Sequence, residues 1–157
     1  KKSILIFVPS IEEGKVLIGN LDLELQEVHK AIYIFFLSNL QGVEKEKVHE
    51  NANKIFNIYK KVKKRTARKT PIGNIFGYKI NQQINKNNVY FVDRDEQFDR
   101  LSSVRTKIKD RIVQKLGESF LKFYNITLVE TNTPEIFKID IPENKINIHS
   151  KFNDLAD

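Results

Sequence analysis

Short apolar runs bounded by turn residues occur near the N-terminus, and Leu21, Leu23 and Leu25 alternate with acidic residues, a pattern typical of β-strands. Strand-like runs occupy Ser3–Val8 and Val16–Ile18, and Leu21–Leu25 forms either a third short strand or an extended lead-in. Pro9 is expected to end the first run, and Glu12–Lys15 has the composition of a turn. The pattern therefore predicts N-terminal antiparallel β-strands.

Further along the chain, apolar residues recur at intervals of three and four, which predicts amphipathic helices. The three predicted helices span Gln26–Leu40, Glu46–Lys64 and Phe98–Leu116. The first is apolar on so many sides that we expect it to be largely buried. Gly42 is placed to end the first helix in a left-handed cap. At the end of the third, either Gly117 forms the cap or the helix bends and continues through Phe120.

After the third helix, Tyr124, Ile126 and Leu128 alternate along one arm and Ile136–Ile141 forms a matching arm, which predicts a β-hairpin over Phe123–Ile141. The turn of this hairpin is expected at Thr131–Pro134, and Lys145–Ile148 could add one more strand. The region between the second and third helices is less regular, with Val89–Val92 as a candidate strand. We expect one domain over residues 1–150, with a long insertion at about 66–97 and a frayed tail at 151–157.

Four segments carry a resemblance to a known family. They are Ala31–Leu37, Gly42–Val48, Ser103–Lys109 and Phe123–Ile126. In layout they resemble the winged-helix DNA-binding domains of the OmpR/PhoB response-regulator type. This resemblance implies an α+β winged helix with N-terminal antiparallel β-strands, three main helices and a C-terminal β-hairpin. It covers residues 29–64 and 98–141 better than 3–28.

The chain departs from that family in two respects. Its insertion is much longer than the family's loop, and the predicted hairpin tip carries Glu130 and Glu135 instead of basic residues. The fold hypothesis makes a definite packing prediction. Val104, Ile108 and Ile112 of the third helix should pack against the first helix around Ile32 and Phe36.

The net charge of +7 is concentrated in two segments. Residues 60–69 contain seven basic and no acidic side chains, and residues 100–122 contain seven basic and two acidic ones. Clustered positive charge in or beside helices favours an anionic partner such as nucleic acid. The alternative is that both segments are solvated helix surfaces.

Two groups of residues are candidates for DNA contact. On the third helix, one face away from the apolar stripe carries Ser102, Arg105, Thr106 and Lys109. Arginine suits guanine edges, and the other three suit phosphates or bases. A major-groove role requires Arg105 and Lys109 to be exposed. The second group would bind phosphates and consists of Lys60, Lys61, Lys63, Lys64, Arg65, Arg68 and Lys69.

Other classes of function find little support. The chain has no Cys, and His29, His49 and His149 lack the spacing of metal ligands. Phosphate-binding glycine loops and nucleophile-elbow motifs are missing from the sequence, so we expect no catalytic residues, no metal and no cofactor. No run of 18 apolar residues occurs, so we expect no membrane span and a cytoplasmic location.

The sequence therefore favours a DNA-binding protein with double-stranded DNA as partner, acting as a bacterial transcription regulator or an accessory module. The alternative is a winged-helix protein-protein interaction module in a larger assembly, without sequence-specific DNA binding. In that hypothesis the 66–97 loop contacts the protein partner.

Overall fold

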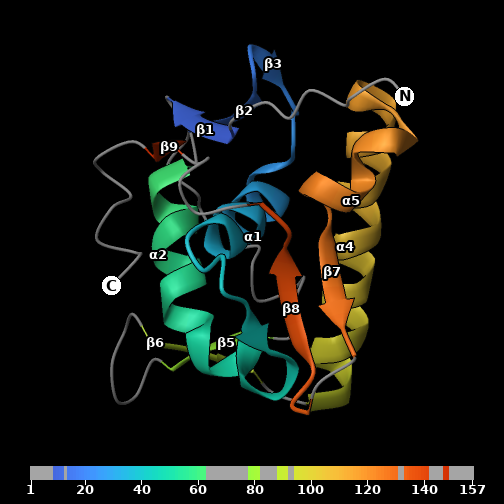
Figure 1. Ribbon diagram of the computed structural model, residues 1–157. Helices are drawn as coiled ribbons and strands as arrows, with labels where there is room; N and C mark the ends of the chain where they lie inside the picture. The colour runs from blue at the N-terminus through green and yellow to red at the C-terminus, as the bar shows by residue number, and fades with distance from the viewer. Residues whose placement is uncertain are drawn as a thin grey trace.

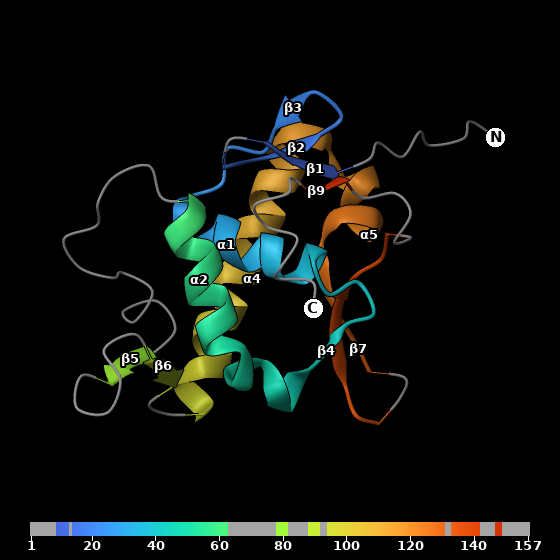
Figure 2. The same ribbon diagram turned by 90° about the vertical axis from the view of Figure 1, so that its left-hand side faces the viewer.

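The structure is a computed structural model that describes residues 9–12, 14–62, 78–81, 88–91, 94–130, 133–141 and 147–148. Within this part of the chain, helices and small β-sheets form an α+β fold (Figure 1). Helix α1 (Glu27–Leu37) lies between α2 (Ala52–Val62) on one side and α4 (Arg94–Leu116) on the other (Figures 1 and 2). None of these helices has the length and hydrophobicity needed to cross a bilayer.

The N-terminal sheet has the strand order β3-β2-β1-β9. Strands β1 (Pro9–Glu12), β2 (Lys15–Ile18) and β3 (Leu21–Asp22) pair in antiparallel fashion, and β9 (Asn147–Ile148) pairs in parallel with β1. The prediction that Pro9 ends a strand is wrong, because Pro9 begins β1. Proline is tolerated at the first position of a strand. The predicted run at residues 3–8 lies outside the described residues.

Helix α1 forms the centre of the core. Its residues Ala31–Leu37 are at most 2% exposed, as the all-round apolar pattern predicts. The helix ends at Leu37, three residues before the predicted Leu40. Just beyond its end, the side chains of Ser38 and Asn39 donate hydrogen bonds to backbone oxygens in the last turns of the helix. Such local bonds compete with continuation of the helix.

A second sheet links the segment after α1 to the C-terminal hairpin. Its order is β4-β8-β7, formed by β4 (Val43–Glu44), β8 (Ile136–Ile139) and β7 (Ile126–Val129). The predicted hairpin is present, whereas β4 was not predicted. Gly42 does not cap α1 but enters β4 with φ +101°, and a Cβ there would collide with the Ile136 side chain. The close approach of β4 to β8 therefore requires glycine.

The predicted second helix begins as a 3₁₀ helix, η1 (Lys45–Asn51), before α2. Within the insertion, β5 (Tyr78–Asn81) and β6 (Asn88–Phe91) form an antiparallel hairpin whose β6 strand contacts α2. The strand predicted at Val89–Val92 corresponds to β6. Residues 94–97 of the insertion belong to α4, and the rest of the insertion and the tail at 151–157 lie outside the described residues.

Helix α4 starts four residues before the predicted Phe98 and ends at Leu116. Gly117 follows with φ +95°, and its N–H donates to Val113 O, so the glycine cap is confirmed and the continuous helix is wrong. The chain then forms η2 (Glu118–Phe120) and a short helix, α5 (Leu121–Tyr124). Phe123 and Tyr124 are therefore not on the hairpin arm. The buried Tyr33 hydroxyl donates to Tyr124 O at 2.6 Å, which ties α5 to α1.

The apolar stripe of α4 is buried as predicted. Leu101, Val104, Ile108 and Ile112 are at most 2% exposed and share one core with Ile32 and Phe36 of α1. The stripe faces α1, so the polar faces of α4 point to either side and outward. Those polar faces are where the first group of candidate DNA contacts lies.

Candidate nucleic-acid interface

The stretch of α4 between Leu101 and Lys109 has a polar, exposed surface. Between Leu101 and Lys109 the sequence contains no Asp or Glu, and the exposed side chains are hydroxyls and lysines. They are Ser102, Ser103, Thr106, Lys107 and Lys109. Asp95, Glu96 and Asp99 precede this stretch in α4 and Asp110 follows it, so only the stretch itself is free of carboxylates.

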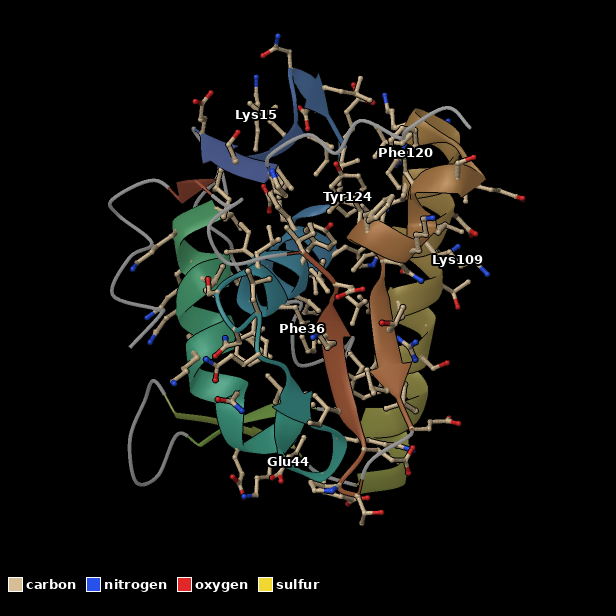
Figure 3. The ribbon with its side chains drawn as sticks, in the orientation of Figure 1. Lys15, Phe36, Glu44, Lys109, Phe120 and Tyr124 are labelled. Carbon is tan, nitrogen blue, oxygen red and sulfur yellow. The ribbon has the colours of Figure 1, made fainter. Side chains whose placement is uncertain are left out.

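Three of the four predicted residues on α4 do lie together in solvent. Ser102, Thr106 and Lys109 are exposed, and Thr106 Oγ1 donates to Ser102 O at 3.0 Å. Lys109 extends from the outer side of α4 (Figure 3). Their spacing places the three side chains on one face. We call these three residues the α4 outer face.

Arg105 does not meet the requirement of exposure. Its side chain is half-buried between α4 and the hairpin, where Nε donates to Ile126 O at 3.1 Å. Its guanidinium carbon lies 4.8 Å from the centre of the Phe137 ring, a cation–π distance. Burial lowers the pKa of the guanidinium. The expectation that Arg105 is free to reach into a groove is therefore wrong, because the hairpin covers that flank of the helix.

The two described members of the second predicted group, Lys60 and Lys61, lie on another side of the molecule. Lys60 is exposed at the C-terminal end of α2, with Nζ 5.0 Å from the centre of the Phe56 ring, and Lys61 is partly buried. The views in Figures 1 and 2 place α1 between α2 and α4, so Lys60 and Lys61 do not join the α4 outer face. The remaining members, Lys63, Lys64, Arg65, Arg68 and Lys69, lie outside the described residues.

The flank of α4 opposite the hairpin contains a group that the sequence prediction missed. Lys107 and Arg111 line a cavity of about 200 Å³ together with His29 of α1. The rest of the lining is Leu25, Gln26, Asp110 and Gln114. The signal available in the sequence was the spacing of Lys107, Arg111 and Gln114 on one helical face. Their proximity to His29 depends on the packing of α4 against α1.

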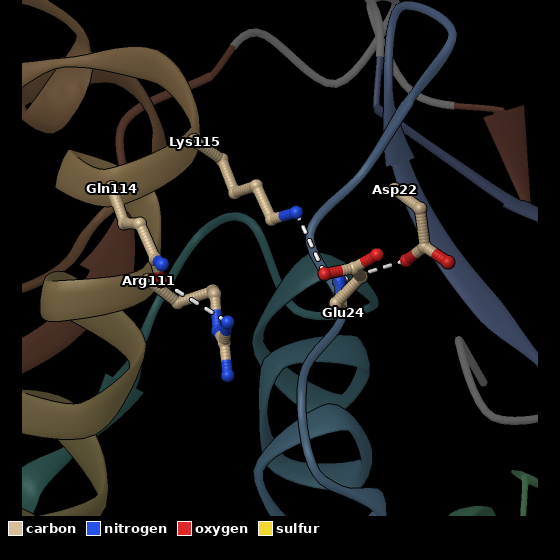
Figure 4. Close-up of polar contacts among 5 residues, drawn as sticks. All are labelled: Asp22, Glu24, Arg111, Gln114 and Lys115. Atoms are coloured by element: carbon tan, nitrogen blue, oxygen red, sulfur yellow. Dashed lines mark hydrogen bonds and ion pairs between the residues drawn. The ribbon is translucent and has the colours of Figure 1, made fainter.

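His29 experiences positive charge from its surroundings. Burial lowers the pKa of the His29 imidazole below 6.5, and the charges of Lys107 and Arg111 lower it further. Among the described residues, no carboxylate is within ion-pair distance of Lys107 or Arg111. Arg111 instead donates to Gln114 Oε1 at 3.1 Å on its own helix (Figure 4).

An ion pair fixes the C-terminal end of α4 next to this cavity. Lys115 Nζ lies 2.7 Å from Glu24 Oε2 in the connection between β3 and α1 (Figure 4). Glu24 has φ +53°, and its backbone N–H donates to Asp22 Oδ1 at 2.8 Å, which holds the turn. The hydrogen bond from Lys115 lowers the pKa of the Glu24 carboxyl.

The hairpin tip carries negative charge, in contrast to the positive charge of Lys107 and Arg111. A hollow of about 580 Å³ separates the tip from the start of η1. Its lining contains three carboxylates and one lysine, and comprises Lys45, Glu46, Glu130, Thr133, Pro134 and Glu135. A duplex that follows α4 would meet repulsion if it also reached this tip.

No trio of His, Asp or Glu side chains in the described part of the chain is arranged to hold a metal ion. Between Leu101 and Lys109 the exposed side chains of α4 are thus hydroxyls and lysines, and Arg111 lies partly exposed two residues further on. No protein-family model, no curated protein and no solved structure matches this chain.

Proposed function

We propose that the chain is a winged-helix domain that binds double-stranded DNA through α4, as part of a transcription regulator or an accessory module. The order α1, β4, α2, α4, β7, β8 and the β4-β8-β7 sheet support this layout, with α4 as the recognition helix and β7–β8 as the wing. The observation that carries the proposal is the acid-free, exposed surface of α4 between Leu101 and Lys109.

The dimensions and chemistry of that surface suit DNA. An α-helix with side chains is about 10–12 Å wide, and the major groove is about 12 Å wide. Lys109 can neutralise a phosphate, and the hydroxyls of Ser102 and Thr106 can accept or donate hydrogen bonds at phosphates or base edges. Arg105 has a structural role in this proposal and does not contact bases.

The test is a fluorescence-anisotropy titration of the whole chain with duplex DNA at several salt concentrations. We expect Lys109→Gln to weaken binding and to flatten the plot of log affinity against log salt by roughly 0.9 per lost phosphate contact. Lys122→Gln is the matched control, because Lys122 is an exposed lysine of α5 outside the α4 outer face. Wild-type protein that fails to bind at low salt, or equal slopes for Lys109→Gln and wild type, would contradict the proposal.

The acidic hairpin tip favours a second candidate function, the binding of a basic protein segment. The hollow lined by Glu46, Glu130 and Glu135 offers carboxylates to such a segment and would repel DNA phosphates. In this alternative the chain is a protein-interaction module and α4 is a solvated surface.

A charge reversal at the tip separates the two candidates. If DNA lies along α4 with the wing beside it, Glu130→Lys together with Glu135→Lys should tighten DNA binding and steepen its salt dependence. If the tip serves a protein partner and α4 is a solvated surface, any DNA binding by the same variant should be unaffected by adding Lys109→Gln. Thermal unfolding of the variant provides the control for folding, because both residues are exposed.

A further inference from the structure

The cavity between α4 and the start of α1 combines features that recognise an oxyanion. Lys107 and Arg111 approach it from one side, and His29 approaches it from the other. Its volume of about 200 Å³ far exceeds the roughly 10–15 Å³ of probe-occupied space that one water molecule needs. The cavity can therefore hold a tetrahedral anion with accompanying water.

The backbone at this place adds to the attraction. Gln26 is the N-cap residue of α1, lines the cavity and makes no side-chain capping hydrogen bond. The first N–H groups of a helix have no partner within the helix, and the helix dipole places partial positive charge there. The acidic residue of this first turn, Glu27, acts electrostatically on Tyr59 of α2, on the other side of α1.

The local charge remains positive when the nearby carboxylates are counted. Asp110 and Lys107 both line the cavity and are both exposed, so water screens the two charges in the same way. Glu24 lies close enough to act on Arg111, but its hydrogen-bond partner is Lys115. Lys107 and Arg111 together therefore outweigh Asp110 at the cavity.

We propose that this cavity binds a phosphate group, held by Lys107, Arg111 and His29 at the N-terminal end of α1. The phosphate has two possible sources with the same chemistry. It belongs either to the backbone of a duplex lying along α4, in which case the inference rests on the proposed function, or to free phosphate or a small phosphorylated molecule.

The experiment follows the titration of His29 by NMR of the imidazole resonances in the full chain. Inorganic phosphate is added in one arm and a short DNA duplex in the other, with chloride at matched ionic strength as the reference. A bound anion stabilises the imidazolium, so we expect the pKa of His29 to rise by about one unit in at least one arm. Lys107→Gln and Arg111→Gln, made separately, should each reduce the shift, and Lys122→Gln should leave it intact.

The outcomes distinguish the two sources. A shift with duplex that Arg111→Gln removes assigns the site to the DNA backbone, and a saturable shift with inorganic phosphate alone assigns it to a free phosphate. If phosphate shifts the pKa and DNA does not bind at all, the inference stands while the proposed function fails. If neither probe moves the pKa, or if the shift persists when both cations are replaced, the inference is wrong even where DNA binds.

Discussion

Arg105 and Arg111 lie on the same helix, about 120° apart around its axis, and have different environments. Arg105 is enclosed between the helix and the hairpin, bonded to Ile126 O and placed over Phe137. Arg111 lines a cavity and is bonded to Gln114 of its own helix. The first guanidinium holds two elements together, and the second remains available to an anion.

The comparison shows that the element packed against each side of α4 determines the role of the arginine on that side. A β-strand offers Arg105 a carbonyl acceptor and an aromatic face, and these compensate the burial of its charge. On the other flank, the start of α1 adds partial positive charge beside Arg111, whose hydrogen-bond acceptor is Gln114 of its own helix. The same side chain is thus a structural residue on one flank and a candidate ligand-binding residue on the other.

The largest effect on stability is expected from Gly42→Ala, which acts where β4 approaches β8 of the hairpin. The substitution forces a side chain into φ +101° and against Ile136, so we expect a loss of roughly 3 kcal/mol in the free energy of unfolding. Chemical denaturation measures this loss. Gly117→Ala is the control, because its φ of +95° is also unfavourable but nothing lies within 4 Å of the added Cβ, so its loss should be smaller. Equal losses at the two glycines would show that the close approach of β4 to β8 is unimportant.

Replacing Arg105 by alanine should cost about 2 kcal/mol of unfolding free energy, because a charged hydrogen bond and a cation–π contact are lost. Arg111→Ala should cost less than about 0.5 kcal/mol, as is usual for surface substitutions. Denaturation curves of the two variants test this directly. Comparable costs would remove the distinction between the flanks.

A double-mutant cycle tests whether Arg105 is energetically coupled to the β4-β8-β7 sheet and Arg111 is not. Phe137 pairs with Val43 next to Gly42 and also lies under Arg105, so Gly42→Ala and Arg105→Ala should not be additive. Gly42→Ala and Arg111→Ala share no neighbour and should add. Additivity in both pairs would mean that Arg105 is not coupled to the β4-β8-β7 sheet.

On the side of α4 that lines the cavity with Lys107 and Arg111, we expect a smaller effect, which is a dependence of the free energy of unfolding on pH. The pKa of His29 is lower in the folded state than its ordinary value of 6.5, so the unfolded state takes up the proton first as the pH falls. The free energy of unfolding should therefore decrease from about pH 7.5 downward through 6.5 and level off below the folded-state pKa. His29→Gln should remove this component, and Lys107→Gln should reduce it. A pH dependence that is unchanged in His29→Gln would assign the effect to other groups.

The smallest effect is expected at the ion pair that borders the cavity. Glu24 is fully exposed, and isolated surface ion pairs contribute little to stability. Glu24→Gln should therefore leave the thermal midpoint unchanged within error at moderate salt. It should strengthen phosphate binding at the cavity, because it removes a negative charge that acts on Arg111. Weaker phosphate binding in this variant would indicate that the ion pair with Lys115 positions the site.

The sequence by itself determined which faces are buried. The intervals between Leu101, Val104, Ile108 and Ile112 predict the stripe that α4 buries, and the alternation at 126–128 and 136–139 predicts the hairpin. The central place of α1 also follows from its pattern. Burial of apolar residues depends on local periodicity, so a single stretch of sequence contains the information.

The tertiary structure alone decided what covers the polar flanks. Nothing near Arg105 in the sequence indicates that Phe137 and Ile126 O will enclose it, and nothing near Lys107 indicates His29. The pairings of β4 with β8 and of β9 with β1 are equally long-range. A helical pattern specifies the direction of a side chain from its own axis, whereas its environment depends on which distant element packs there. For a polar residue that environment determines whether its charge serves stability or a ligand.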